Sequence, residues 1–374
     1  MESREGINLF SLEERKEYLT MHGQYSISFS TIQQGMSYYD IDGIGYIAFR
    51  ETFLSRIHIL GNPVAEADHY ETLLIALAKT KTIASAAQIN EEFALILKSH
   101  GYILNRSGYE SSIDTDQFTL TGKNKKLLRK AKNTCLKANI SVVRFNAEKN
   151  SKDQLADISI EWLKSKRNGA RELTFLTRPM ATPLATDTEI LLGIKENKII
   201  GFVIYDPIYK DKQIIGYTAS VLRQRKNTPN GLLDFINIEK IQRMKKSGIK
   251  IFSLGWTPLA GLSPQHYKGE SAYTHQILRF SYKHLNIFYA YKDLAFHKER
   301  YRPNTTLLFF AFDTRLPIIN LTELLWISRI YSPANTYHNT IRFTCNAKRT
   351  LGNKIQKIIK TICKQLILQK RIKK

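Results

Sequence analysis

The sequence has few cysteines, no long apolar run and no acidic residue near its end. Its three cysteines, Cys135, Cys345 and Cys363, are an odd number at wide spacing, which excludes a disulfide framework and a zinc site built from paired cysteines. No apolar run approaches the ~18 residues that cross a bilayer, and no charged segment followed by an apolar run opens the sequence. These absences predict a reduced, cytoplasmic protein without a bound metal or a membrane-spanning helix.

The balance of charge is strongly basic. The 374 residues include 56 Lys and Arg against 33 Asp and Glu, which gives a net charge of +23. No acid follows Glu323, and 12 basic residues lie between Leu324 and Lys374, so +11 remains for the rest of the chain. Both parts would attract polyanions, meaning nucleic acid or an anionic membrane surface, although charge also serves solubility alone. The length favours two folded domains.

Short strands and helices alternate along the chain in two similar stretches. The first is expected to hold strands at 26–30, 45–49, 54–59 and 83–87, helices at 11–21, 60–79 and 90–100, and an edge strand at 103–113. The second is expected to hold helices at 152–165 and 232–246 and strands at 189–195, 199–205, 213–222 and 249–254. Alternation of this kind predicts an α/β fold built in layers around a sheet.

A pair of arginines follows the strand expected at 213–222. Arg223 and Arg225 precede Asn230 and Gly231, which open the next helix. Two guanidinium groups and several backbone N–H groups are therefore expected to converge at a helix N-terminus, a geometry that binds anions. Asp234 lies in the first turn of that helix, where the helix dipole favours its charge whether its role is structural or catalytic.

A segment rich in glycine and proline follows the strand expected at 249–254. Gly255, Trp256, Pro258 and Leu259 are expected in a tight loop. Glycine would allow a close approach to a ligand, and Trp256 could stack on a base or cover an acyl chain. Loops of this kind are also common after strands without any function, so it is the pairing with the arginine motif that favours a shared site.

The segment 119–137 is a predicted basic helix between the two stretches. Its apolar stripe of Leu127, Leu128 and Ala131 would face the protein, so several cations would face outward together. A polyanion partner is favoured over a merely solvated basic face. The cations are Lys123, Lys125, Lys126, Arg129, Lys130 and Lys132.

The end of the chain, 348–374, has the pattern of a basic amphipathic helix. Apolar residues recur at helical spacing from Ile355 to Ile367, and lysines fall mostly on the other side. Such a helix lies in the headgroup plane of an anionic membrane or docks on its own protein. The pattern does not separate these two alternatives.

The two motifs of the second stretch together resemble the C-terminal domain of the bacterial phosphatidylglycerol lysyltransferases. The matches are R-x-R-x-x-x-P-N-G-x-x-D-F at 223–235 and L-G-x-x-P-L-x-G-L at 254–262, with looser ones at 60–63, 121–131 and 291–301. Asn62 and Ser220 stand where the family pattern has Asp. Members of the family usually carry a long membrane-embedded region before this part.

The resemblance implies two tandem GNAT-like (acyl-CoA N-acyltransferase-like) α/β domains and a basic C-terminal helical tail. The expected N-terminal domain is 1–145, which includes the basic linker helix 119–137. The expected catalytic domain is 146–330 and the expected tail is 331–374.

The resemblance also implies an enzyme that moves an amino acid from aminoacyl-tRNA to a hydroxyl group, most plausibly of phosphatidylglycerol or another anionic lipid, without a cofactor. The expected partners are tRNA and an anionic membrane surface contacted through 348–374, at the inner face of the cell membrane. The expected catalytic residues are Arg223, Asp234, Lys298 and Arg300. The residues expected to bind substrate are Arg225, Asn230, Gly231, Gly255, Trp256, Pro258 and Leu259, and those expected to bind phosphates are Lys123, Lys125, Lys126, Arg129 and Lys130.

Two other functions fit the residues. An acyl-CoA-dependent N-acyltransferase would keep the fold, but the turn 224–230 lacks the glycines of a pyrophosphate-binding loop. A non-catalytic module that binds tRNA or membrane would fit the missing acid at Ser220. His266, His275 and His297 are possible bases, although no partner pattern supports any of them.

Overall fold

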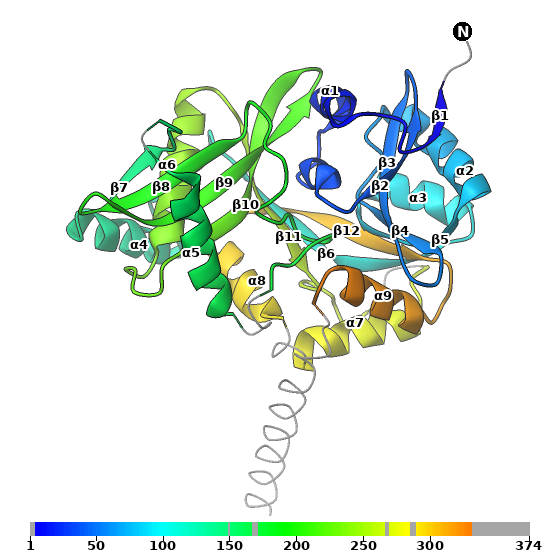
Figure 1. Cartoon of the computed structure of the whole chain (residues 1–374). Helices are drawn as coiled ribbons and strands as arrows, with labels where there is room; N and C mark the ends of the chain where they lie inside the picture. Colours follow the sequence, from blue (N-terminus) through cyan, green and yellow to red (C-terminus); the bar gives the residue numbers. More distant parts are fainter. Residues whose placement is uncertain (1–3, 149, 167–170, 266–268, 285–288, 331–374) are drawn as a thin grey trace, which may run out of the picture. The chain divides into compact units, whose positions relative to one another are not determined.

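The computed structural model describes residues 4–148, 150–166, 171–265, 269–284 and 289–330 (Figure 1). Within these ranges one 12-stranded sheet has the order β1-β2-β3-β4-β5-β12-β6-β11-β10-β9-β8-β7. The predicted α/β class is therefore confirmed. The tail predicted at 331–374 lies outside the described residues.

The first half of the sequence supplies the elements from β1 to β6. They are β1 (Glu5–Ile7), α1 (Leu12–His22), η1 (Ser28–Ile32), β2 (Ser37–Ile41), β3 (Gly45–Glu51), β4 (Arg56–Leu60), η2 (Ala67–His69), α2 (Tyr70–Thr80), β5 (Thr82–Ile89), α3 (Glu91–Ser99) and β6 (Ile103–Asp114).

The second half begins with the basic helix. Its elements are η3 (Lys123–Lys125), α4 (Lys126–Lys137), β7 (Ser141–Arg144), α5 (Lys152–Lys164), β8 (Glu189–Lys195), β9 (Lys198–Lys210), β10 (Gln213–Gln224), α6 (Leu232–Lys246), β11 (Ile251–Pro258), α7 (Ala272–His284), α8 (Tyr291–Glu299), β12 (Asn304–Phe312) and α9 (Ile318–Ile327).

One plan occurs twice along the chain. In the first half, β2, β3 and β4 are antiparallel neighbours, and α2 leads to β5, which lies parallel to β4. In the second half, β8, β9 and β10 are antiparallel, and α6 leads to β11, which lies parallel to β10. The last strands are exchanged, because β12 pairs with β5 and β6 while β6 pairs with β11. The halves therefore share one sheet, and the predicted boundary at 145 stays a prediction.

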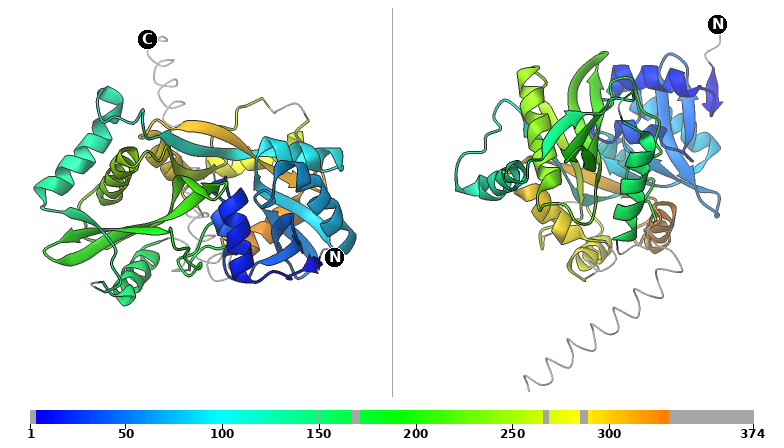
Figure 2. Two further views of the ribbon diagram at one scale, coloured as in Figure 1. Left: turned by 90° about the horizontal axis from the view of Figure 1, so that it is seen from above. Right: turned by 60° about the vertical axis from the view of Figure 1, so that its left-hand side comes forward.

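The apolar pattern of the strands explains the layers. In the second half, Leu191 and Val203 belong to the cluster that packs on α6, whereas their neighbours Leu192 and Phe202 belong to the cluster that packs on α5. Because successive side chains of a strand point to opposite faces, the two helices cover opposite faces of the sheet (Figure 2). Both faces are buried.

Local capping explains where several helices begin. Ser11 accepts a hydrogen bond from the backbone of Glu14 at 3.2 Å, and Glu14 accepts one from the backbone of Ser11 at 2.6 Å, so a capping box begins α1 at the predicted place. Asn90 caps α3 in the same way, by accepting from the backbone of Phe93 at 3.0 Å. The helix bounds predicted for α6 and α5 agree with the structure to within one residue.

Three predicted elements are wrong. Residues 26–30 were expected to be a strand but lead into η1, where Thr31 donates its hydroxyl to the backbone of Ser28 at 2.6 Å and so favours a turn. The helix expected at 60–79 begins only at Tyr70, because Leu60 is still the last residue of strand β4. The segment 103–113 was expected at an edge but forms the central strand β6, because neighbours satisfy its polar side chains, as Thr257 does for Ser111 at 3.1 Å.

Gly231 is required by the packing of two helices. It has φ of +92°, and a Cβ there would lie 2.4 Å from Cβ of Ala131 on α4. We expect Gly231→Ala to lower the free energy of unfolding by about 3 kcal/mol, from backbone strain and overpacking together. Gly248→Ala is the matched control, since φ is +72° and a Cβ there meets nothing within 4 Å. Urea unfolding compares the two, and equal losses would contradict the packing role.

Candidate active site

A cleft opens where two parallel strands separate. β10 and β11 pair only from Gly216 with Ile251 to Thr218 with Ser253. Beyond these residues β10 stays paired with β9, while β11 pairs with β6. The strand ends border a cavity of ≈ 200 Å³. The lining residues from these two strands are Thr218, Ala219, Ser220, Leu222, Leu254, Gly255 and Trp256.

The cleft lies between the two halves of the molecule. A connection within the second half carries Phe175 and Leu176 across to the first half, where Gln33 accepts from the Phe175 backbone at 2.6 Å and Gln88 donates to the Leu176 carbonyl at 2.8 Å. The remaining lining residues are Ser26, Ile27, Ser30, Gln88, Leu176, Thr177, Arg178, Tyr289, Leu294, His297 and Lys298.

Lys298 is the predicted catalytic residue that the structure places in this cleft. It stands on α8 and is only 6% exposed. Its Nζ donates to the backbone carbonyls of Gly255 at 2.9 Å and Trp256 at 2.7 Å, so it is tied to the strand end that borders the cleft. Burial lowers the pKa of Lys298 to about 7, and the negative charge of Glu110 opposes this only in part. A lysine that is partly neutral at physiological pH can accept a proton.

Asp234 and Arg300 meet behind Lys298 and do not line the cleft. Asp234, buried in the first turn of α6, accepts from Nη1 of Arg300 at 2.7 Å and from the hydroxyl of Tyr301 at 2.6 Å. These contacts fix the C-terminal end of α8. Nε2 of His297, which does line the cleft, lies 3.6 Å from Oδ1 of Asp234. Burial lowers the pKa of His297.

Arg223 and Arg225 do not form the anion pocket expected from their spacing. Arg223 donates to Glu172 at 3.0 Å and lies over the ring of Trp162 at 3.9 Å, and Arg225 donates to Glu161 at 2.9 Å. Neither lines the cleft. The acids come from α5 and the connection after it, which the arginine motif itself could not indicate. The catalytic role expected for Arg223 and the substrate-binding role expected for Arg225 stay predictions.

The helix N-terminus beside these arginines contacts another helix. Gly231 packs against Ala131 of α4, so its lack of a side chain allows α4 and α6 to pack together. Asn230 is exposed and lies outside the residues that line the cleft. The expectation that the arginines, this turn and the Gly/Pro segment share one pocket is therefore corrected.

The expected Gly/Pro loop is largely strand. β11 continues through Pro258, because Gly255 to Pro258 pair with Ser111 to Gly108 of β6 after an irregularity in register at Gly255, whose φ is +73°. Gly255 and Trp256 line the cleft as predicted, whereas Pro258 and Leu259 do not. Leu259 is buried and donates its backbone N–H to Ser107 at 2.7 Å.

Some cations of the basic helix make hydrogen bonds within the protein. Lys125 donates to the carbonyl of Tyr301, and Arg129 donates to those of Leu120 and Gly122 at 2.5 and 2.6 Å. Leu127 is exposed, and the stripe that is buried instead consists of Leu128, Ala131 and Cys135. The exposed cations that remain are Lys123, Lys126 and Lys130.

Several site residues carried no sequence signal. Arg178 lines the cleft and its Nε lies 2.5 Å from Oδ2 of Asp206 on β9, with both side chains almost fully buried. Burial raises the pKa of Asp206. Nη2 of Arg178 and Nε1 of Trp256 are buried without a hydrogen-bond partner among the described residues. Because buried donors are normally paired, these two favour a ligand that carries acceptors.

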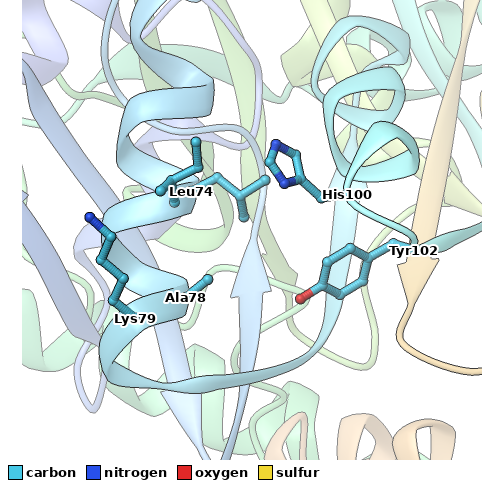
Figure 3. A pocket seen from close by; sticks show the side chains of 6 residues that line it. Leu74, Ala78, Lys79, His100 and Tyr102 are labelled. Carbon is cyan, nitrogen blue, oxygen red and sulfur yellow. The ribbon is translucent and has the colours of Figure 1, made fainter.

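A larger hollow lies on the first half, away from these residues. It measures ≈ 490 Å³ between α2 and the start of β6 (Figure 3). Lys79 and His100 in its lining are exposed, and His100 is paired with Glu71 at 2.7 Å. Binding sites combine apolar walls with convergent, buried polar groups, so the smaller cleft is the better candidate. The other residues that line the larger hollow are Leu74, Ile75, Ala78, Lys79 and Tyr102.

The described residues contain no group of three or more His, Cys, Asp or Glu that could hold a metal ion. Each helix in them is too short or too polar to cross a bilayer. Cys135 is buried and free. His266, one of the possible bases, lies outside the described residues, and His275 lies 3.5 Å from Glu270.

Curated relatives match most of this chain. The phosphatidylglycerol lysyltransferases of Bacillus subtilis (strain 168) and Staphylococcus haemolyticus (strain JCSC1435) are 25% and 23% identical to it over 293 and 279 residues. These alignments cover 74% and 73% of this chain and 32% and 31% of the relatives. The chain thus spans about a third of the length of the curated relatives it matches.

Solved structures share its fold. L-PGS from Bacillus licheniformis has a TM-score of 0.70 at 22% identity, over 86% of this chain and 96% of that one. The C-terminal domain of a putative lysylphosphatidylglycerol synthetase from Agrobacterium fabrum has a TM-score of 0.69 at 17% identity, over 84% and 96%. The family model described as phosphatidylglycerol lysyltransferase, C-terminal, matches residues 15–312. This match covers most of the chain, which therefore belongs to the phosphatidylglycerol lysyltransferase C-terminal family.

Proposed function

We propose that this chain transfers the aminoacyl group of an aminoacyl-tRNA to a hydroxyl group of phosphatidylglycerol, in the cleft between β10 and β11. The observation that carries the proposal is Lys298, a buried lysine that lines the cleft with a pKa of about 7. The names of the curated relatives support the lipid acceptor. No cofactor is needed, because the ester bond to tRNA is already activated.

The reaction exchanges one ester for another. The acceptor hydroxyl oxygen attacks the aminoacyl carbonyl carbon and loses its proton, and the ribose oxygen leaves and gains one. Neutral Lys298 has two N–H groups and one lone pair. The two N–H groups donate hydrogen bonds to the carbonyls of Gly255 and Trp256. That lone pair takes the proton of the acceptor hydroxyl, and the resulting ammonium returns a proton to the ribose oxygen. Orientation in the cleft supplies much of the remaining rate.

Other predicted residues support Lys298 from a distance. Asp234 binds Arg300 and Tyr301, which directly follow α8, and so positions the helix that carries Lys298. Arg223 binds Glu172, which accepts from the backbone of Met180 in the connection that lines the cleft. In this account Asp234, Arg300 and Arg223 are positioning residues.

The exposed part of the basic helix supports tRNA as the donor. Lys123, Lys126 and Lys130 are exposed on η3 and α4, without interleaved acids in that segment. Clustered lysines bind phosphates through a salt-dependent attraction. The rival donor, an acyl-CoA, would place its pyrophosphate at the N-terminus of α6, where Ala131 packs against Gly231. This contact favours the tRNA donor.

The proposal is tested by following the label of the amino acid. The purified chain is incubated with phosphatidylglycerol vesicles and with a set of tRNAs, each charged with its own labelled amino acid. We expect at least one label to enter the lipid fraction in proportion to the amount of chain. Label that stays on tRNA or appears only as free amino acid in every reaction would contradict the proposal, as would lipid-independent transfer from an acyl-CoA.

A further inference from the structure

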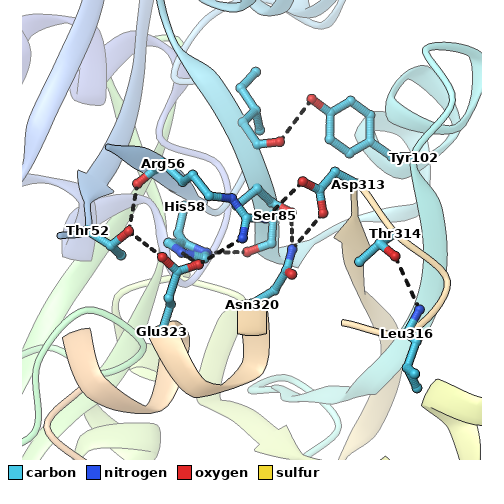
Figure 4. A network of polar contacts seen from close by, with 12 residues as sticks. Thr52, Arg56, His58, Ser85, Tyr102, Asp313, Thr314, Leu316, Asn320 and Glu323 are labelled. Carbon is cyan, nitrogen blue, oxygen red and sulfur yellow. Dashed lines mark hydrogen bonds and ion pairs between the residues drawn. The ribbon is translucent and has the colours of Figure 1, made fainter. Parts of the chain in front are cut away.

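The helix α9 has its polarity reversed. Its one charged residue, Glu323, faces the protein and is 1% exposed. Glu323 accepts from the hydroxyl of Thr52 at 2.5 Å and lies 3.4 Å from Arg56 and 3.3 Å from His58 (Figure 4). The outer side holds large apolar residues instead. A helix on a surface that contacts only water normally turns its apolar side chains toward the protein and its charged side chains outward.

The exposed apolar residues around α9 form one surface, which we call the α9 face. It consists of Leu316, Ile318, Ile319 and Trp326, which are 51%, 56%, 57% and 48% exposed. α7 lies beside it, since Ser271 and Thr274 donate to the carbonyl of Arg315 at 2.6 and 2.9 Å. Figures 1 and 2 show α7 and α9 on the same side of the molecule.

An arginine lies at each end of this face, and the nearby exposed Asp313 is paired with Arg56 at 2.8 Å. Arg315 precedes α9 and Arg329 follows it, and both are exposed. An apolar strip that carries a tryptophan and is flanked by arginines matches the boundary between the headgroups and acyl chains of an anionic membrane. The same positive borders disfavour the basic segment 331–374 or a second copy of this basic chain as the partner, because like charges would meet.

We propose that the α9 face docks this protein on an anionic membrane surface, with Ile318, Ile319 and Trp326 entering the interface. The proposal deepens the proposed function and rests on it for the identity of the lipid. α8 connects the two sites, because its residues Leu294, His297 and Lys298 line the cleft while its Tyr291 packs on the apolar cluster that holds Leu278 of α7 and Leu324 of α9. A lipid headgroup would then reach the cleft without leaving the bilayer.

Vesicle binding by the full chain tests the docking face. Ile318→Glu/Ile319→Glu is compared with Ile75→Glu/Leu95→Glu, which makes the same charge change at exposed apolar residues of α2 and α3. With vesicles of phosphatidylcholine and phosphatidylglycerol, we expect the first variant to lose at least about tenfold in partition coefficient and the second to change by less than about threefold. Equal losses in the two variants would overturn the proposal.

Tryptophan fluorescence identifies what covers the α9 face. This measurement does not require the Ile318→Glu/Ile319→Glu variant to fold. The difference between the unchanged chain and Trp326→Phe isolates the emission of Trp326. We expect acrylamide to quench this emission in buffer and vesicles to protect it. Protection already present in buffer would mean that residues 331–374 or a second copy covers the face. Vesicle binding without protection would mean docking elsewhere. Both results would overturn the proposal.

Transfer to two forms of the acceptor separates docking from catalysis. Ile318→Glu/Ile319→Glu should lose transfer to vesicles at least about tenfold and keep transfer to short-chain, monomeric phosphatidylglycerol. Loss of both to the same extent would contradict a docking role. If the unchanged chain transfers to neither acceptor, the proposed function fails, while the binding and quenching results still decide whether the face docks.

Discussion

Replacing Lys298 by methionine should lower the rate of aminoacyl transfer about a thousandfold, which is within the usual contribution of a general base. Methionine keeps the length and the apolar part of the side chain, so α8 can still pack. It removes the lone pair that takes the proton of the acceptor hydroxyl and the two hydrogen bonds to Gly255 and Trp256. Initial rates of label transfer to lipid, at saturating donor, measure the effect.

The dependence on pH distinguishes a base from a structural lysine. Burial places the pKa of Lys298 at about 7, so its neutral, proton-accepting form increases as pH rises through 7. We therefore expect the rate of the unchanged chain to rise over the same interval and then to level off. Lys298→Met should lose this rise. Lys292→Met, at an exposed lysine of the same helix, is the control and should keep it. A rate that falls between pH 6 and 8 would contradict the role of base.

Asp234→Ala should produce the largest loss of stability, about 4 kcal/mol in the free energy of unfolding, because removing one partner of a buried ion pair leaves the other unpaired. Asp234 is 2% exposed, and its two oxygens accept from Tyr301 and Arg300. The hydroxyl of Tyr301 is fully buried and would lose its acceptor. Urea unfolding monitored by circular dichroism measures the change.

The exposed Asp293 of α8 provides the control for Asp234. Asp293→Ala removes the same kind of side chain from the first turn of another helix, and we expect a loss of less than about 0.5 kcal/mol in the free energy of unfolding, because the site is exposed. Transfer should also fall in Asp234→Ala, even at temperatures where the variant is folded, because the end of α8 is no longer fixed. Unchanged stability in Asp234→Ala would show that this pair does not hold α8.

Much of the fold follows from local signals that the sequence carries openly. The Ser11–Glu14 capping box, the Asn90 cap and the continuous apolar run of β8 are set by neighbours in the chain, and the structure contains all three. The exchange of β6 and β12 could not be predicted in this way. It depends on pairings such as Phe310 with Ala87 and Asn105, which lie far apart in sequence.

The candidate site divides along the same line. Lys298 and Gly255 match family motifs, Trp256 stands at a variable position within one of them, and all three line the cleft. No sequence motif marks Arg178 and its partner Asp206. They come together only in the folded chain, where the connection after α5 reaches β9. The anion pocket predicted for the two arginines of the 223–235 motif is not formed. Each arginine pairs with an acid outside the motif, Arg223 with Glu172 and Arg225 with Glu161.

The cleft itself is tested most directly by a structure with a bound donor mimic. An adenosine that carries an aminoacyl group through a stable amide in place of the ester can bind but not react. Our account predicts that its carbonyl group lies in the cleft between β10 and β11, within hydrogen-bond distance of Nζ of Lys298. An aminoacyl group bound instead at the N-terminus of α6, beside Arg223 and Arg225, with the cleft left empty, would contradict it.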